Sequence, residues 1–196
     1  MVNLQSSDTW VAVLHGNNMI KPEDHQLTLD RENYSQKFWN EDSSIRLVHV
    51  ENYLLFKDDL KRVLSLLEEQ LPDWDERPKD FNDIIKRFNS ESKCFLFYYN
   101  NECIGWNWIN EKVRFNWRTI DKDLPEGWIY AGGLYLSNKV DRPPYSAKTF
   151  QNIRSKYLFD NGYEKICVYC DSWNTNAVRM CTSNSFINED WYYLLK

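Results

Sequence analysis

The last third of the chain constrains the fold more than any other part. An apolar strand pattern over residues 128–136 is followed by a loop at 142–147, a helix pattern and a second apolar strand at 165–170. A strand, helix and strand in this order predict a right-handed crossover and a parallel pair of strands. The loop gathers backbone N–H groups at a helix N-terminus, where a phosphate binds without a dedicated basic pocket. The pattern therefore indicates a coenzyme site.

The residues before this unit predict two helices and an antiparallel hairpin. Residues 45–50 alternate as a strand, and helical spacing follows over 58–71 and again over 81–88. Two strands, 94–99 and 103–109, flank the turn Asn100-Asn101, and residues 113–117 continue the sheet. A short helix at 175–183 and a strand at 191–195 complete the chain. We therefore expect an α/β (α+β) fold with a mixed, mainly antiparallel central sheet flanked by helices.

The first 44 residues carry the weakest patterns. Residues 10–14 resemble a short strand, whereas residues 21–44 are polar with scattered aromatic side chains. We therefore predict an N-terminal extension, 1–44, packed on a main domain of residues 45–196. Three roles are open for this extension: it caps a ligand pocket, it pairs with a second subunit to give a homodimer, or it shields a sheet edge.

Composition narrows the class of protein. A net charge of −5 argues against a nucleic-acid platform, and no run approaches the roughly 20 apolar residues that cross a bilayer. The N-terminus has no secretory signal pattern, which predicts a cytoplasmic protein. The five cysteines are odd in number, and Cys167 and Cys170 point to opposite faces of one strand, so we expect reduced thiols and no metal.

Two local motifs stand out in the last third of the chain. Arg142 and Ala147 begin and end a loop that contains Tyr145, and Asn174, Ala177 and Phe186 follow the second strand. These motifs and the order of elements over residues 45–196 resemble the GCN5-related N-acetyltransferase (GNAT) superfamily. The family's coenzyme loop is matched at its two ends, with Tyr145 in place of a glycine, and the family's motif of Asn, two residues, Ala, a later aromatic and then Gly-Phe is matched by the second group. Cys181 and Ser185 stand where tyrosine and glycine are usual.

The resemblance implies transfer of an acyl group from acetyl-CoA or a longer acyl-CoA to an amine. A backbone amide near Leu134 would polarise the thioester carbonyl, and the arm of the coenzyme would run beside the strand. Since Cys181 replaces the family's proton-donating tyrosine, that role is vacant or has moved. The implied coenzyme-binding residues are Leu134, Tyr135, Leu136, Arg142, Tyr145, Ser146, Ala147, Lys148, Asn174 and Ala177.

Three side chains are candidates for the base that removes the amine proton. They are Asp171 at the end of a strand, Tyr135 in the preceding strand and Glu102 in the hairpin. Each of these residue types is more often structural at such a position, and a water relay is the alternative.

The tryptophans suggest the acyl acceptor. Flat aromatic faces suit sugars and nucleobases, so the tryptophans of the central strands predict a small-molecule amine as acceptor, namely an amino sugar carried on a nucleotide. The alternative is that these rings simply pack in the core. This group is Trp106, Trp108, Trp117 and Trp128, with Arg114, Arg118 and Lys122 nearby to meet a diphosphate.

Two other functions stay open. A peptide or protein amine is one alternative acceptor, for which an acidic groove would come from Glu68, Glu69, Asp73, Asp75 and Glu76. The other is a non-catalytic acyl-CoA-binding module.

Overall fold

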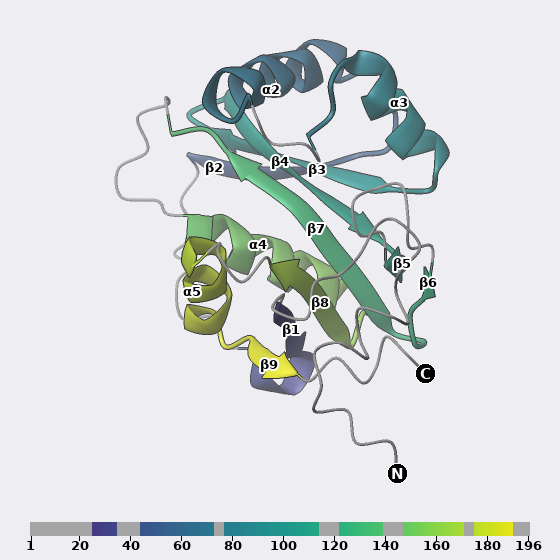
Figure 1. Ribbon diagram of the computed structural model, residues 1–196, viewed down its shortest axis with the longest axis vertical. Helices are drawn as coiled ribbons and strands as arrows, with labels where there is room; N and C mark the ends of the chain where they lie inside the picture. Colours follow the sequence, from purple (N-terminus) through teal and green to yellow (C-terminus); the bar gives the residue numbers. More distant parts are fainter. Residues whose placement is uncertain are drawn as a thin grey trace, which may run out of the picture.

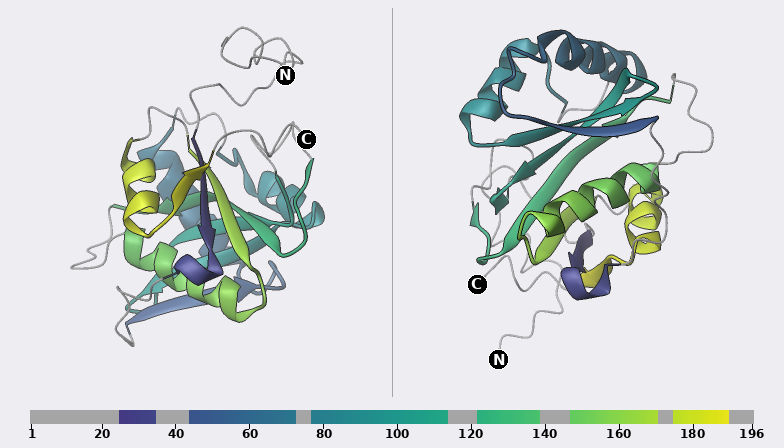
Figure 2. Two further views of the ribbon diagram at one scale, coloured as in Figure 1. Left: turned by 90° about the horizontal axis from the view of Figure 1, so that it is seen from below. Right: turned by 180° about the vertical axis from the view of Figure 1, so that it is seen from behind.

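A seven-stranded sheet forms the centre of the molecule, with helices on both faces (Figure 1). The computed structural model describes residues 25–34, 44–72, 77–113, 122–138, 147–170 and 175–189. The strand order is β2-β3-β4-β7-β8-β1-β9, and β5 (Lys112–Val113) and β6 (Lys122–Asp123) form a separate two-stranded ribbon. Helices α2 and α3 cover one face of the sheet, and α4 and α5 lie on the other (Figure 2).

Most strand pairs of the sheet are antiparallel. β2 (Ile45–Val50), β3 (Lys93–Tyr99), β4 (Glu102–Asn110) and β7 (Trp128–Leu136) pair in turn in this way. Among the described strands, only β7 and β8 (Lys165–Cys170) pair in parallel, and the crossover between them carries α4. The prediction of a mixed, mainly antiparallel sheet flanked by helices is confirmed.

Local sequence explains the elements on the first face. Helix α2 (Lys57–Gln70) buries Leu60, Val63 and Leu67 at helical spacing against the sheet. Helix α3 (Phe81–Asn89) begins where the Asp80 carboxylate accepts the N–H of Asp83 at 3.0 Å, an N-cap. The β3–β4 turn places both Asn100 and Asn101 at positive φ, 50° and 65°, which asparagine tolerates better than most residues.

Apolar cores lie on both faces of the sheet. One joins α2 and α3 to the inner residues of β3, β4 and β7, with Trp106 and Trp108 among its fully buried side chains. Another lies beneath α4 (Ala147–Asp160) and α5 (Thr175–Ser183) and contains Phe95, Leu158 and Phe186. The sheet is therefore covered on both faces.

Strand β1 (His25–Asp30) is the main departure from the predicted elements. It lies inside the sheet, antiparallel to β8 on one side and to β9 (Ile187–Glu189) on the other. The sequence pattern predicts no strand in residues 21–44, whereas residues 25–30 of the expected extension form a strand within the sheet. The predicted strands at 10–14 and 191–195, and residues 114–117 of a third, lie outside the described residues.

The described residues contain neither a membrane-spanning helix nor a cluster of metal-ligating side chains. None of the helices there has the length and apolarity to cross a bilayer. Among the same residues, His, Cys, Asp and Glu side chains form no group of three or more that could hold a metal ion.

His49 on β2 predicts a loss of stability in acid. Burial lowers the pKa of its imidazole, against the opposing effect of the Glu51 carboxylate, and the ring stacks on Phe95 at 5.1 Å between centroids. The unfolded chain therefore binds a proton at His49 more readily, and the free energy of unfolding falls as the pH drops below about 6.5. Urea denaturation at about pH 7.5 and about pH 5.5 should show a smaller fall for His49→Phe than for the parent. Equal falls in both proteins would contradict this assignment.

Candidate functional site

Strands β7 and β8 part at their carboxyl ends. They pair only over Trp128–Tyr130 and Lys165–Cys167, and the rest of β7 has no register partner on β8 (Figure 1). In sheets of this kind, ligands bind outside the carboxyl ends of parallel strands. The parting of β7 from β8 therefore marks the candidate site.

A β-bulge in β7 lies beside this parting. Trp106 of β4 pairs with Tyr135 and Trp108 pairs with Gly132, so Gly133 and Leu134 together oppose the single residue Asn107. Gly133 has a φ of +59°, a conformation that a residue without a Cβ adopts at little cost. A bulge leaves one residue out of the ladder and re-aims its backbone groups. The bulge is at the position where the resemblance implies a backbone amide near Leu134.

A buried chain of polar groups holds the bulge from beneath. Asn107 Nδ2 donates to the carbonyl oxygen of Gly132 at 2.8 Å, and Arg154 Nη1 of α4 donates to Asn107 Oδ1 at 3.1 Å. Arg154 Nη2 lies 3.4 Å from Ser155 Oγ. Arg154 and Asn107 are 1% and 0% exposed, so α4 is tied to the bulge through two fully buried side chains.

Arg154 is an unusual buried cation. It forms no ion pair with a carboxylate of the described residues, and its Nε has no hydrogen-bond partner among them. Burial lowers the pKa of its guanidinium to about 10, and the group remains charged at neutral pH. Since a buried charge is costly, its hydrogen bond to Asn107 matters more to the fold than a surface contact would.

Helices α4 and α5 are joined by a second polar group. Gln151 Nε2 donates to Cys181 Sγ at 3.1 Å, and Asn184 Nδ2 donates to the carbonyl oxygen of Lys148 at 3.1 Å and to Gln151 Oε1. Cys181 is fully buried. The thiol at the family's tyrosine position therefore lies inside the helix–helix interface.

Two of the three candidates for the base lie in described strands, Tyr135 next to the bulge in β7 and Glu102 in β4. Tyr135 is 5% exposed and its side chain packs in the core beneath α2. Glu102, at the start of β4, forms an ion pair with Arg62 of α2, and both side chains are partly exposed. Asp171 lies outside the described residues. Tyr135 is therefore a core side chain and Glu102 is half of an ion pair, while the role of base stays a prediction for all three residues.

The implied coenzyme residues divide into two groups. Leu134 and Leu136 lie on β7, partly buried beside Phe150, while Ala147 and Lys148 begin α4 and Ala177 lies in the first turn of α5. The end of β7 is fixed by Gln70 of α2, whose Nε2 donates to Ser137 Oγ at 2.8 Å. Tyr135, between the two leucines on β7, is buried in the core beneath α2. The other implied residues, Arg142, Tyr145, Ser146 and Asn174, lie outside the described residues.

The four tryptophans do not form one acceptor surface. Trp106 and Trp108 are 1% and 0% exposed, so their rings are core residues that offer no face to a ligand, contrary to the expectation from sequence. Trp128, at the start of β7, is half-buried with Lys165 Nζ 4.5 Å from its ring centroid. Trp117, Arg114, Arg118 and the side chain of Lys122 fall outside what the structure describes. Alternate burial along a strand explains Trp106 and Trp108, because both face α2 and α3.

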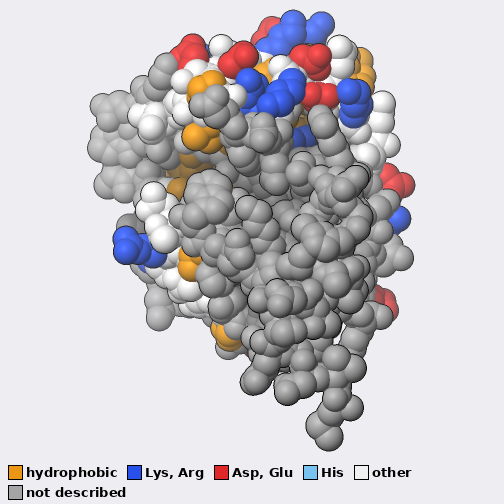
Figure 3. All heavy atoms as spheres, viewed as in Figure 1, with side chains coloured by type: hydrophobic (Ala, Val, Ile, Leu, Met, Phe, Trp, Pro, Cys, Tyr) orange, Lys and Arg blue, Asp and Glu red, His pale blue; other side chains and the backbone are white. Residues whose placement is uncertain are grey.

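The expected acidic groove is only partly described. Glu68 lies 3.6 Å from Arg77, and Asp73, Asp75 and Glu76 fall outside the described residues along with the loop that carries them. On the face drawn in Figure 3, acidic and basic side chains are interspersed over α2 and α3.

Sequence reasoning missed Asn107 and Arg154. A signal was present for the first, because Asn107 is a polar residue inside the apolar run of β4. Arg154 carries no such signal, since arginine on a helix is ordinarily a surface residue. The sequence alone also does not indicate that the side chains of Asn107 and Arg154 contact each other.

The fold is similar to that of solved acetyltransferases. An aminoglycoside acetyltransferase from an uncultured soil metagenomic sample matches with a TM-score of 0.54 and 17% identity, over 80% of this chain and 100% of that one. A GCN5-related N-acetyltransferase from Kribbella flavida matches with a TM-score of 0.52 and 10% identity, over 92% of this chain. A ribosomal-protein-alanine N-acetyltransferase from Brucella melitensis matches with a TM-score of 0.51 and 9% identity, over 74% of this chain and 91% of that one.

These likenesses are structural. No family model and no curated protein matches the chain. The chain spans 59% of the length of the Kribbella flavida protein. The parting of β7 and β8, the bulge and the similar solved structures together show that the chain has the GCN5-related N-acetyltransferase fold.

Proposed function

We propose that the protein is an N-acyltransferase that moves an acyl group from acyl-CoA to the amine of a small molecule. The observation that carries this proposal is the β7 bulge at Gly133–Leu134, anchored by Asn107 beside the parting of β7 and β8. A backbone N–H released from the ladder there is suited to polarise a thioester carbonyl. Acyl transfer from a thioester needs alignment and proton management more than a covalent nucleophile, and no metal takes part in this scheme.

The coenzyme would lie along β7 and reach the start of α4. Leu134 and Leu136 would flank its arm, and the first backbone N–H groups of α4, at Ala147 and Lys148, would meet its pyrophosphate. This assignment rests on the family resemblance at Arg142 and Ala147 and on the position of α4 directly after β7.

An amine on a sugar is the acceptor class we favour. One structural neighbour is by name an aminoglycoside acetyltransferase. The narrower proposal of a nucleotide-linked amino sugar loses Trp106 and Trp108 as support, because both rings are buried. A ribosomal-protein-alanine N-acetyltransferase is also a neighbour, so a protein amine remains the alternative acceptor.

A non-catalytic acyl-CoA-binding module is the second candidate. It is favoured by the setting of Cys181, which is buried and bound by Gln151 at the position where the family places its proton donor. Release of free thiol from acyl-CoA in the presence of amines separates the two functions: a binding module retains affinity for the coenzyme and releases none.

A thermal-shift panel with acetyl-CoA, longer acyl-CoAs and free coenzyme A tests both candidates. A ligand at about 100 times its dissociation constant adds roughly 2.7 kcal/mol of stability, so binding is readily seen. Ala147→Trp is expected to weaken coenzyme binding at least about tenfold, because the new side chain occupies the start of α4. Ser65→Trp, on an exposed position of α2, serves as the matched control and should bind as the parent does. Unchanged binding by Ala147→Trp would place the coenzyme elsewhere.

A further inference from the structure

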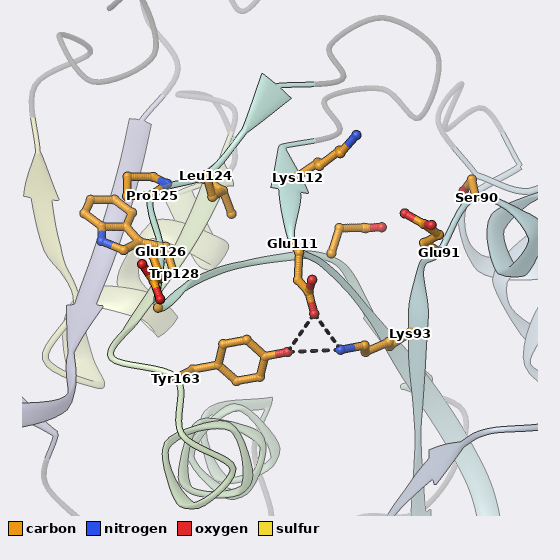
Figure 4. A pocket seen from close by; sticks show the side chains of 12 residues that line it. Ser90, Glu91, Lys93, Glu111, Lys112, Leu124, Pro125, Glu126, Trp128 and Tyr163 are labelled. Atoms are coloured by element: carbon orange, nitrogen blue, oxygen red, sulfur yellow. Dashed lines mark hydrogen bonds and ion pairs between the residues drawn. The ribbon is translucent and has the colours of Figure 1, made fainter.

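A cavity of about 550 Å³ lies at the opposite end of β7 from the bulge. Its walls come from the turn after α3, the end of β4, the loop before β7 and Tyr163 (Figure 4). Trp128 in its lining precedes Gly133 by five residues of strand, about 16 Å at the usual rise of a strand. The cavity is therefore separate from the candidate site at the parting of β7 and β8.

The side chains of Lys93, Glu111 and Tyr163 form a hydrogen-bonded group at the base of this cavity, in which the charges of Lys93 and Glu111 neutralise each other. Lys93 Nζ donates to Glu111 Oε1 at 2.8 Å and to the Tyr163 hydroxyl at 3.0 Å, and that hydroxyl lies 3.2 Å from Glu111 Oε1 (Figure 4). The hydrogen bond from Lys93 lowers the pKa of Glu111, which keeps the carboxylate ionised. Lys93 is therefore already occupied by protein groups and does not call for an anionic ligand.

Two further carboxylates line the cavity without such compensation. Glu91 and Glu126 lie on opposite sides of the Lys93–Glu111–Tyr163 group (Figure 4), and neither forms an ion pair with another residue that the structure describes. Both are exposed. Lys112 also lines the cavity, so the lining holds three carboxylates and two ammonium groups, with one net negative charge. Negative charge in a concave site raises the local concentration of cations, which favours a positively charged ligand.

Asn110 adds an independent requirement for a hydrogen-bond acceptor. It lines the cavity, it is 2% exposed, and its Nδ2 has no hydrogen-bond partner among the described residues. A buried donor without a partner costs about 1–3 kcal/mol, and such groups in native proteins call for an explanation, a missing ligand or water among them. A hydroxyl or carbonyl oxygen beside the amide would supply the partner.

We propose that this cavity is a second binding site, with Glu91 and Glu126 as its anionic groups and Asn110 in its wall, for a hydroxylated organic ammonium ion. Its volume falls in the range of about 300–1,000 Å³ typical of small-molecule sites. Leu124 and Pro125 supply apolar surface beside the carboxylates. The site goes beyond the proposed acyl transfer and does not depend on it.

Triethanolamine is a suitable probe, because it is a protonated amine with three hydroxyl groups and, as a tertiary amine, forms no stable amide with an acyl group. Isothermal titration without coenzyme should give one site per chain. Glu91→Asn and Glu126→Gln together should weaken binding at least about tenfold. Asparagine suits position 91, where φ is 63°, so the fold is retained. Glu32→Gln, at an exposed glutamate outside the cavity lining, is the matched control.

Asn110→Leu separates a binding role from a structural one. Since it removes a buried donor that has no partner, the melting temperature should stay the same or rise while the affinity for triethanolamine falls. Absence of binding by the parent, or equal affinity in the parent and these variants, would overturn the proposal. Loss of binding on adding acetyl-CoA, or in Ala147→Trp, would also overturn it by placing the ammonium ion at the β7–β8 site.

Discussion

Replacing Asn107 by leucine is expected to lower the free energy of unfolding by about 3 kcal/mol, although the side chains are similar in size. The cause is Arg154, whose buried guanidinium would lose the acceptor Asn107 Oδ1 and retain only the longer contact to Ser155 Oγ at 3.4 Å. Gly132 would lose the donor to its carbonyl oxygen in the same variant. Urea denaturation at neutral pH measures the change.

The double variant Asn107→Leu with Arg154→Met provides the control. Removing both partners leaves no uncompensated charge between α4 and β4, and the Gly132 carbonyl oxygen alone still lacks its side-chain donor. The loss of stability should therefore be smaller than the sum of the two single losses. A double-mutant cycle gives the difference directly. Additive losses would show that Arg154 and Asn107 act independently, against the contact seen between them.

The double variant also isolates the part that these residues play in positioning the bulge. In the double variant the carbonyl oxygen of Gly132 still lacks the side-chain donor that fixes it beside Gly133. Under the proposed function, thiol release from acyl-CoA should then fall while the fold persists. A rate equal to that of the parent would assign Arg154 and Asn107 to stability alone.

Sequence patterns predicted the elements whose signals are local. The spacing of Leu60, Val63 and Leu67 gives α2, and two asparagines between β-rich runs give the β3–β4 hairpin. The sequence pattern does not indicate strand β1, because this strand is short, four of its six residues (His-Gln-Leu-Thr-Leu-Asp) are polar, and its partner β8 is distant in the chain. Thr28, polar and 0% exposed, shows that burial there follows from the neighbouring strands.

The candidate site was predictable only in outline. The resemblance at Ala147 and Ala177 indicates the start of α4 and the first turn of α5. The bulge arises from the register between β4 and β7, in which two residues of β7 oppose one residue of β4. The sequence of either strand alone does not indicate this register. For Trp106 and Trp108 the residue type was misleading. Tryptophan suggested contact with a ligand, whereas the alternation of side chains along the strand places both rings in the core.

Leu29→Ala is expected to lower the free energy of unfolding by about 3 kcal/mol, which tests whether β1 belongs to the cooperative core. Leu29 is 1% exposed, pairs in register with Ile166 of β8 and packs in the core beneath α4 and α5. Leu54→Ala is the matched control, because Leu54 is 62% exposed and its loss should change stability by no more than about 0.5 kcal/mol.

The size of the Leu29 effect decides how the N-terminal residues relate to the rest of the sheet. β9 pairs with β1 and lies at the edge of the sheet, so a weakened β1 also loosens β9 and uncovers the edge of β8. A single, equally steep unfolding transition at lower urea in Leu29→Ala would show that residues 25–30 unfold together with the β2–β8 core. A loss as small as that of Leu54→Ala would instead make β1 a separable strand, and the boundary predicted at residue 44 would then also describe the unfolding unit.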